Sequence, residues 1–170
     1  MSPISYTVSE QAGLFVLVAK NPEGVCAISL GKSPTALASS LKNDFPNTDL
    51  EFKLPLLFPE WLEVQAFFND PKHVCRFSLY QTGTAFQREV WQVLSRIPCG
   101  KTLSYQQVAQ ELGKPQAVRA VAGACAANKL ALVVPCHRVV RSNGEISGYR
   151  WGVDVKRHLL AFEAECINSF

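Results

Sequence analysis

The chain has 170 residues, of which 48% are hydrophobic and 18% charged, and its formal net charge is +3. This composition excludes a disordered chain, and no apolar run approaches the roughly 18 residues that a membrane span needs. The N-terminus carries no basic stretch followed by a long apolar one, so we expect no membrane partner and a cytoplasmic location, or a nuclear one in a eukaryote.

The six cysteines show no pattern of a metal site or of a disulfide scaffold. They stand at positions 26, 75, 99, 125, 136 and 166, without a C-x-x-C pair. Such spacing predicts free thiols and no structural zinc.

The two halves of the chain differ in charge. Residues 1–84 carry six Lys and Arg against eight Asp and Glu, a balance of −2, whereas residues 85–170 carry eleven against six, a balance of +5. A polyanionic partner would therefore bind the C-terminal half.

The N-terminal half is predicted to be a small α/β unit with a sheet. It begins with a hairpin whose strands, 13–20 and 25–31, flank an Asn-Pro-Glu-Gly turn. Turn and cap signals place the remaining elements. These are helices over 33–41 and 58–68 and strands over 51–55 and 75–80.

From Thr84 onward the pattern is helical, with apolar residues recurring at helical spacing. The second and third helices are short and joined by a tight turn, which is typical of a helix-turn-helix. Ser104 and Gln107 form a capping box at the start of this pair, and Gly113 ends its first helix. The four helices are expected over 84–97, 104–113, 116–128 and 153–167.

The helix over 116–128 allows two interpretations. Its core-facing residues are expected to be Val118, Val121, Ala122 and Cys125. The opposite face carries small residues and one long side chain, Arg119. Small residues allow a neighbouring element to pack closely; alternatively, the helix lies on DNA without reading base edges, and Arg119 inserts into the duplex.

The stretch VVPCHRVV, residues 133–140, places Cys136 and His137 between two aliphatic runs that each read as a buried strand. A cysteine is a strong nucleophile as its thiolate, which a nearby histidine promotes. Neighbouring residues of a strand point to opposite faces, so contact between the two side chains needs a bent backbone after Pro135 or a bridging water.

Glu163 on the last predicted helix lies near its apolar face and needs a partner there. If it folds back onto His137, it fixes the tautomer of the imidazole, as in hydrolytic triads. Each group also has a plain structural explanation: a packed cysteine, a locally satisfied histidine, and a glutamate paired with Arg138 or Lys156.

The segment from IPCGK to LLAFE, residues 97–163, closely resembles the O6-alkylguanine-DNA alkyltransferases, or methylated-DNA–protein-cysteine methyltransferases, especially the bacterial adaptive-response type. The resemblance is dense over 83–165 and rests on PCHRV with its spacing to SYQQ and to the Ala/Gly-rich helix. It implies an α/β N-terminal domain, 1–81, with a ribonuclease H-like sheet and a scaffold role. It also implies a mostly α C-terminal domain, 82–170, with a winged helix-turn-helix.

The resemblance implies direct-reversal DNA repair without a metal or cofactor. Cys136 would accept the alkyl group of O6-alkylguanine, with O4-alkylthymine as a second candidate substrate, and would keep it as a thioether after one turnover. His137 would deprotonate Cys136 through a water, and Glu163 would orient the imidazole. Asn128 would brace the turn that carries the cysteine, and Tyr105 would donate a proton or hydrogen bond to the leaving guanine.

The implied partner is double-stranded DNA, bound by a monomer through the minor groove with little sequence preference, with the damaged base extruded. Arg119 would fill the gap in the base stack, and Lys114 would contact a phosphate. The implied DNA-binding residues are Tyr105, Gln106, Lys114, Arg119 and Ser142. The implied substrate pocket is formed by Val139, Tyr149, Arg150 and Trp151, with the bulk of Trp151 narrowing it.

Two other functions fit parts of the sequence. A non-catalytic helix-turn-helix damage sensor would use the same DNA-binding surface, but it has no need for the acceptor Cys136. A cysteine hydrolase on Cys136, His137 and Glu163 would need an oxyanion hole and a route for water, and the sequence shows neither.

Overall fold

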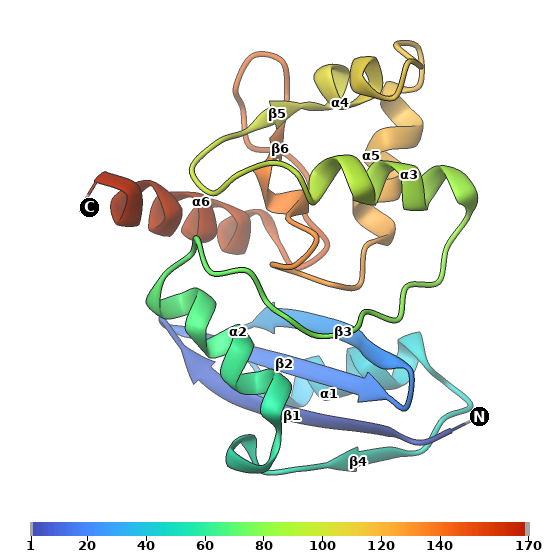
Figure 1. The fold of residues 1–170 in the computed structure, drawn as a ribbon, viewed down its shortest axis with the longest axis vertical. Coiled ribbons are helices and arrows are strands. Elements are labelled where there is room, and N and C mark those ends of the chain that lie inside the picture. Colours follow the sequence, from blue (N-terminus) through green and yellow to red (C-terminus); the bar gives the residue numbers. More distant parts are fainter. Residues whose placement is uncertain (1, 169–170) are drawn as a thin grey trace. The chain divides into compact units, whose positions relative to one another are not determined.

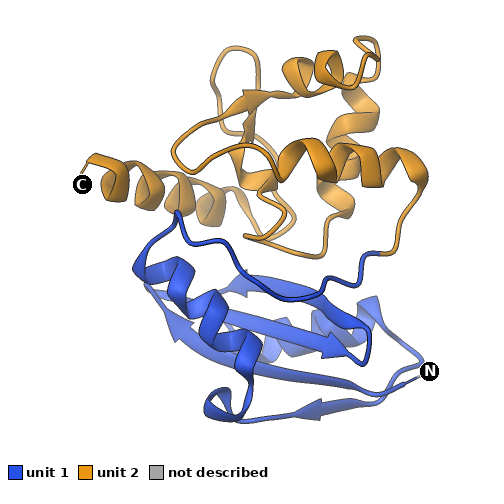
Figure 2. Cartoon of the chain, viewed as in Figure 1, with its two compact units in different colours: residues 1–81 blue, residues 82–170 orange. Residues whose placement is uncertain are grey.

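The computed structural model describes residues 2–168, which divide into two compact units with the boundary between Gln81 and Thr82 (Figure 2). The first unit is built on a β-sheet, and the second is mostly helical (Figure 1). Over these residues, no helix combines the length and the apolar character that crossing a membrane requires.

The sheet of the first unit is mixed and has the strand order β3-β2-β1-β4 (Figure 1). The first three strands form an antiparallel meander, and the fourth pairs parallel with β1. Their bounds are β1 Ile4–Gln11, β2 Leu14–Asn21, β3 Gly24–Gly31 and β4 Leu50–Phe52. The predicted hairpin is therefore confirmed as β2 and β3.

Two helices cover opposite faces of this sheet (Figure 1). Helix α1, Pro34–Asp44, packs Leu37 and Leu41 into a core cluster that includes Leu17 of β2. Helix α2, Pro59–Asn69, buries four side chains. These are Trp61, Val64, Phe67 and Phe68. Both predicted helices are confirmed, and each carries a proline in its first turn, where the missing N–H costs no hydrogen bond.

Strand prediction failed where pairing depends on distant residues. β1 was missed, although apolar residues alternate with Ser and Thr along it, as is typical of a half-buried strand. The expected strand over 75–80 is wrong, because this segment makes only an isolated bridge between Leu79 and Val25. β4 ends at Phe52, short of the expected 51–55, and Pro55 begins the 3-10 helix η1, Pro55–Leu57.

The second unit contains four helices, two short parallel strands and a 3-10 turn within the described residues (Figure 1). The helices are α3 Ala85–Leu94, α4 Tyr105–Glu111, α5 Val118–Ala127 and α6 Val153–Asn168. The other elements are β5 Leu103–Ser104, β6 Val139–Val140 and η2 Cys136–Arg138. The indole of Trp91 on α3 donates to the Ala124 carbonyl on α5 at 2.9 Å, which ties the two helices together.

All four predicted helices of this half are confirmed, with shifted ends. The capping box of Ser104 and Gln107 is present, and Gly113 has a φ of +69° beyond the end of α4. α5 begins at Val118, so Pro115 lies in the turn before it. The aliphatic runs around the cysteine were expected to read as strands, but only Val139–Val140 form one.

Gly13 and Gly24 lie at the turns of the two hairpins formed by β1, β2 and β3. Both have positive φ, yet a Cβ on Gly24 would lie 2.6 Å from the Ser78 carbonyl oxygen, whereas one on Gly13 would meet nothing within 4 Å. We expect Gly13→Ala to lower the free energy of unfolding by about 1 kcal/mol from backbone strain alone. Gly24→Ala adds a clash with backbone and should cost about 3 kcal/mol. Urea unfolding measures both, and equal losses would contradict this account.

Candidate functional site

Cys136 lies on a sharp turn of the chain and not on a strand. It begins the 3-10 turn η2, and Pro135 before it has φ −81° and ψ 63°. The Arg138 amide closes the turn by donating to the Pro135 carbonyl at 2.9 Å. The bent backbone that contact between Cys136 and His137 would require is therefore present, and the thiol is 3% exposed.

Glu163 joins the two basic residues that follow the cysteine. Its Oε1 lies 2.7 Å from His137 Nε2, and Arg138 donates to both carboxylate oxygens from Nε and to Oε1 from Nη2, at 2.7–3.1 Å. The remaining Arg138 nitrogen, Nη1, donates to the Ile97 carbonyl at 2.8 Å. Two of the three partners considered for Glu163, His137 and Arg138, thus bind it together, whereas Lys156 donates to backbone carbonyls instead.

Burial and the neighbouring charges together determine the protonation states of Glu163 and His137. Burial raises the pKa of Glu163, but hydrogen bonds from His137 and Arg138 outweigh it and bring the pKa to about 2. Burial lowers the pKa of His137, so its imidazole is neutral. Because the carboxylate is ionised, His137 Nε2 carries the proton and donates a hydrogen bond to it. The lone pair of the neutral imidazole is therefore on Nδ1, which has no partner among the described residues.

Asn128 braces the turn that carries the thiol. It caps the C-terminus of α5, and its Nδ2 donates to the Val134 carbonyl at 2.9 Å and to Cys136 Sγ at 3.3 Å. Its Oδ1 accepts from the Leu130 amide at 2.9 Å. Burial raises the pKa of Cys136, although the Asn128 hydrogen bond and the Lys156 charge work against it, so the resting group is the thiol.

Lys156 is a site residue that sequence reasoning did not assign. Its side chain is fully buried, and Nζ donates to the carbonyls of Ser147 at 2.8 Å and Gly148 at 3.2 Å. Nζ also lies 3.5 Å from the Tyr105 hydroxyl. The available signal was its spacing, since Lys156 stands seven residues before Glu163 and therefore on the same buried face of α6.

Tyr105 is the first residue of α4, and its hydroxyl donates to the Ser147 carbonyl at 3.4 Å. Burial raises the pKa of this phenol, so it is a donor at neutral pH. The Tyr105 hydroxyl, which belongs to a residue of the pocket wall, therefore has the cationic Lys156 ammonium beside it.

A pocket of about 520 Å³ opens above the thiol. Five of the predicted site residues line it: Tyr105, Arg119, Cys136, Tyr149 and Arg150. The others in its wall are Val118, Ala122, Cys125, Ala126, Arg141, Ser147 and Gly148. Val139 and Trp151 are not among them. Val139 is fully buried. Trp151 packs edge-to-face on the Tyr149 ring at 5.1 Å and lies 6.0 Å from the Arg150 guanidinium, so it contacts two residues of the wall without lining the pocket itself.

The outer face of α5 is open, and Arg119 stands on it. Ala122, expected in the core, is exposed, as are Gly123 and Ala126. A Cβ on Gly123 would meet nothing within 4 Å. Within residues 2–168, therefore, no element packs against this face, and the close-packing interpretation of its small residues is wrong for this chain.

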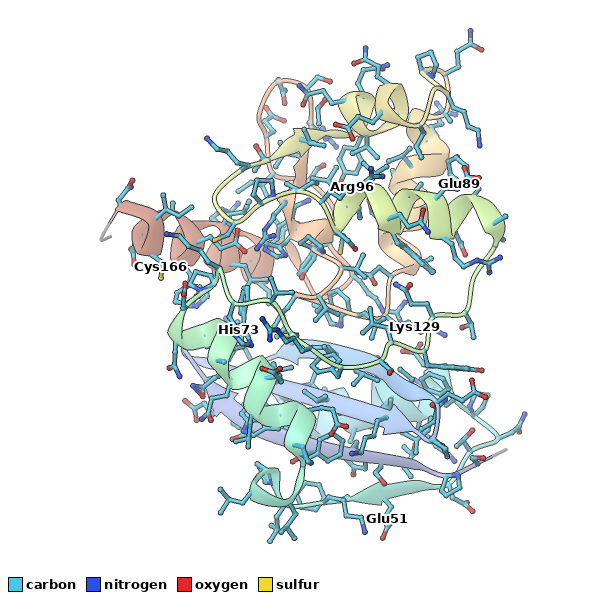
Figure 3. The ribbon with its side chains drawn as sticks, in the orientation of Figure 1. Glu51, His73, Glu89, Arg96, Lys129 and Cys166 are labelled. Carbon is cyan, nitrogen blue, oxygen red and sulfur yellow. The ribbon has the colours of Figure 1, made fainter. Side chains whose placement is uncertain are left out.

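The other predicted DNA-binding residues lie outside the pocket wall. Lys114 pairs with Glu89 of α3 at 2.9 Å, and both side chains are about half exposed (Glu89 is labelled in Figure 3). Gln106 donates to the Pro115 carbonyl at 3.0 Å. Ser142 is exposed on the turn that follows β6.

The site combines a buried cysteine, Cys136, with a neutral histidine and its carboxylate partner, and the cysteine lines an open pocket beside the exposed face of α5. Such a combination is typical of the class of proteins that use a reactive cysteine. Over residues 2–168, His, Cys, Asp and Glu side chains form no group of three that could hold a metal ion.

Residues 85–165 match the family model described as 6-O-methylguanine DNA methyltransferase, DNA binding domain. A methylated-DNA–protein-cysteine methyltransferase of Debaryomyces hansenii is 34% identical over 171 residues, and the match covers 93% of this chain and 90% of the relative. The chain belongs to the methylated-DNA–protein-cysteine methyltransferase family.

The bacterial relatives named Ada are more similar but longer. The bifunctional transcriptional activator/DNA repair enzyme Ada of Escherichia coli is 53% identical over 150 residues, which is 88% of this chain and 42% of the relative. The chain thus spans less than half the length of this relative.

Solved structures share the whole fold. The O6-methylguanine methyltransferase of Mycobacterium tuberculosis superposes with a TM-score of 0.78 at 28% identity, covering 95% of this chain and 93% of that one. The same enzyme in complex with DNA gives 0.77 at 28% identity, covering 95% and 94%.

Replacing Glu163 by Gln tests the buried cluster. The Arg138 guanidinium then lacks a counter-ion in a buried place, so we expect the free energy of unfolding of the second unit to fall by about 3–5 kcal/mol. In the unchanged protein, the pKa of Glu163 is lowered from 4.5 to about 2, so its stabilisation is complete above pH 4.5 and is lost as the pH falls toward 2.

Urea unfolding between pH 2 and pH 7 measures both effects. Asp154→Asn, an exposed carboxylate on the same helix, is the matched control and should leave the stability within about 0.5 kcal/mol. An acid-induced loss of equal size in Glu163→Gln and in the unchanged protein would show that Glu163 is not its source.

Proposed function

We propose that this protein repairs O6-alkylguanine in DNA by moving the alkyl group onto Cys136, in a single turnover that inactivates it. The observation that carries the proposal is the buried Cys136 thiol at the floor of the 520 Å³ pocket, next to a neutral His137 with a free Nδ1. The relatives named methylated-DNA–protein-cysteine methyltransferase support it. O4-alkylthymine is a second candidate substrate.

Activation begins with removal of the thiol proton. The base is Nδ1 of His137, which has no hydrogen-bond partner among the residues described, and a water between it and Cys136 would carry the proton. The resulting imidazolium is stabilised by Glu163, which is ionised at any physiological pH. Arg138 holds that carboxylate in place from the far side.

The transfer is one nucleophilic displacement. The Cys136 sulfur forms a bond to the alkyl carbon, the bond from that carbon to guanine O6 breaks, and its electron pair stays on the guanine. Tyr105 donates a hydrogen bond or proton to the leaving base, and the cationic Lys156 beside its hydroxyl favours the charge that develops there. The product is a thioether. Water does not cleave its carbon–sulfur bond at neutral pH, so the thiol is not regenerated and the protein acts once.

The substrate reaches the thiol by extrusion from double-stranded DNA, because a base inside the stack lies out of reach of a buried group. α4 and α5 serve as a winged helix-turn-helix that binds in the minor groove, and Arg119 on the open face of α5 fills the stack. Further contacts to the DNA backbone come from Gln106, Lys114 and Ser142. Small side chains on α5 read no base edges, so sequence preference is low.

We further propose that the two compact units are domains, 1–81 and 82–170. The sheet order of the first, three antiparallel strands with a parallel fourth beside β1, supports a ribonuclease H-like classification and a scaffold role. The protein acts as a monomer in the cytoplasm, or in the nucleus of a eukaryote.

Transfer of a labelled methyl group tests the function. After incubation with duplex DNA that carries radiolabelled O6-methylguanine, we expect label on the Cys136 peptide at no more than one equivalent. Cys125→Ser removes another thiol from the same pocket and is the matched control, which should keep the label on Cys136. DNA that is bound but keeps its label would indicate a damage sensor, and repeated turnover a hydrolase.

Tyr105→Phe keeps the ring in the pocket wall and removes the hydroxyl near Lys156. We expect the rate of transfer at saturating DNA to fall about 100-fold, in the range of general acid catalysis, with little change in the affinity for DNA. Single-turnover rates measured against DNA concentration separate the two. A loss of affinity with an unchanged maximal rate would show that the hydroxyl acts in binding alone.

A further inference from the structure

Arg141 stands at the rim of the pocket and was not expected among the site residues. It lines the pocket together with Arg119 and Arg150, so three guanidinium-bearing side chains surround an opening whose wall includes no carboxylate. Arg119 comes from α5, whereas Arg141 comes from the turn after β6. The rim is therefore cationic on two sides.

The backbone at Arg141 is held in a defined turn. The Arg141 amide donates to the Glu145 carbonyl at 3.0 Å, and the Gly144 amide donates back to the Arg141 carbonyl at 2.8 Å. Asn143 Oδ1 accepts from the Glu145 amide at 3.0 Å, and Gly144 takes a φ of +84°, which a glycine adopts without strain. These hydrogen bonds hold the backbone in place at the residue whose side chain lines the pocket, Arg141.

Among the described residues, the Arg141 side chain makes one ion pair, and it is weak. Its Nη1 lies 3.9 Å from Glu145 Oε2, and the two side chains are 61% and 67% exposed. An ion pair this long and this exposed contributes little to stability and exchanges readily for a better acceptor. A DNA phosphodiester is such an acceptor, because its two unesterified oxygens match the planar guanidinium and because DNA concentrates many such charges along its backbone.

An extruded nucleotide brings a phosphate to this place. Its base enters the pocket, while its sugar and flanking phosphates remain at the rim, since the DNA strand continues on both sides. Arg141 and Arg119 line the same pocket from different elements, so a phosphate of the extruded nucleotide would come within reach of a cation there.

We propose that Arg141 is a phosphate clamp for the extruded nucleotide, and that Glu145 occupies its guanidinium until DNA displaces it. This inference rests on the proposed function and adds a DNA contact and a competing counter-ion to it. Glu145 then acts as an internal competitor, which weakens binding to all DNA equally and leaves the chemistry at Cys136 untouched.

Binding isotherms at several salt concentrations test the clamp. Duplex DNA with O6-methylguanine is titrated with Arg141→Gln, Glu145→Gln and the double variant, each carrying Cys136→Ala so that no transfer occurs. Arg141→Gln should reduce the slope of log K against log salt by about 0.9 and weaken binding about five-fold at 0.15 M salt, since one phosphate contact is lost. Glu145→Gln should tighten binding two- to five-fold.

The gain from Glu145→Gln should vanish when Arg141 is also replaced, because the competitor then has nothing to hold. Arg157→Gln and Asp154→Asn, an exposed pair at 3.1 Å in the same unit, control for net charge. If Arg141→Gln and Arg157→Gln give the same slope and affinity while the unchanged protein still transfers label to Cys136, the clamp is wrong and the proposed function stands. If the unchanged protein transfers no label, the proposed function fails and the clamp fails with it.

Discussion

The second unit depends on one buried carboxylate. Glu163 on α6 is 1% exposed and accepts hydrogen bonds from His137 and Arg138 on the turn that follows Pro135. The same arginine reaches the Ile97 carbonyl, and the Gly100 amide lies 3.4 Å from Glu163 Oε2. Three segments far apart in the sequence thus meet at one charge. A buried ion without its partners is strongly destabilising, so we expect the stability of the second unit to depend on the complete cluster.

The carboxylate also divides its work between structure and chemistry. Arg138 neutralises its charge with three hydrogen bonds, so the acidity of the histidine is set mainly by burial, and the imidazole stays neutral at rest. Glu163 then needs only to hold the Nε2 proton, which leaves Nδ1 as a base. The positive charge of Arg138 lowers the pKa of His137 in the same direction as burial, whereas the carboxylate of Glu163 raises it.

The sequence predicted those parts of the molecule whose signals are local. Caps, turns and apolar periodicity located all six α-helices and the β2–β3 hairpin, and the PCHR stretch with Glu163 located the centre of the site. The predictions that failed depend on residues distant in the sequence. They are the missed strand β1, the strand expected over 75–80, which makes only a bridge at Leu79, and the expected burial of Ala122. Lys156 was considered only as a partner of Glu163, because a lysine on an apolar stripe usually extends its ammonium toward water, whereas here the ammonium donates to the backbone carbonyls of Ser147 and Gly148.

Burial raises the pKa of Cys136, and a protonated thiol is a poor nucleophile. The arrangement is nevertheless consistent with a group that reacts once. A thiolate in the open would be oxidised or alkylated by small reagents before a damaged base arrived. Burial keeps Cys136 protonated, while Asn128 and Lys156 already favour the anion. A base that fills the pocket removes water and strengthens both of these interactions, because they then act in a medium of lower dielectric constant. On the function proposed above, the thiol would therefore be most reactive with its substrate in place, and burial would protect a residue that reacts only once.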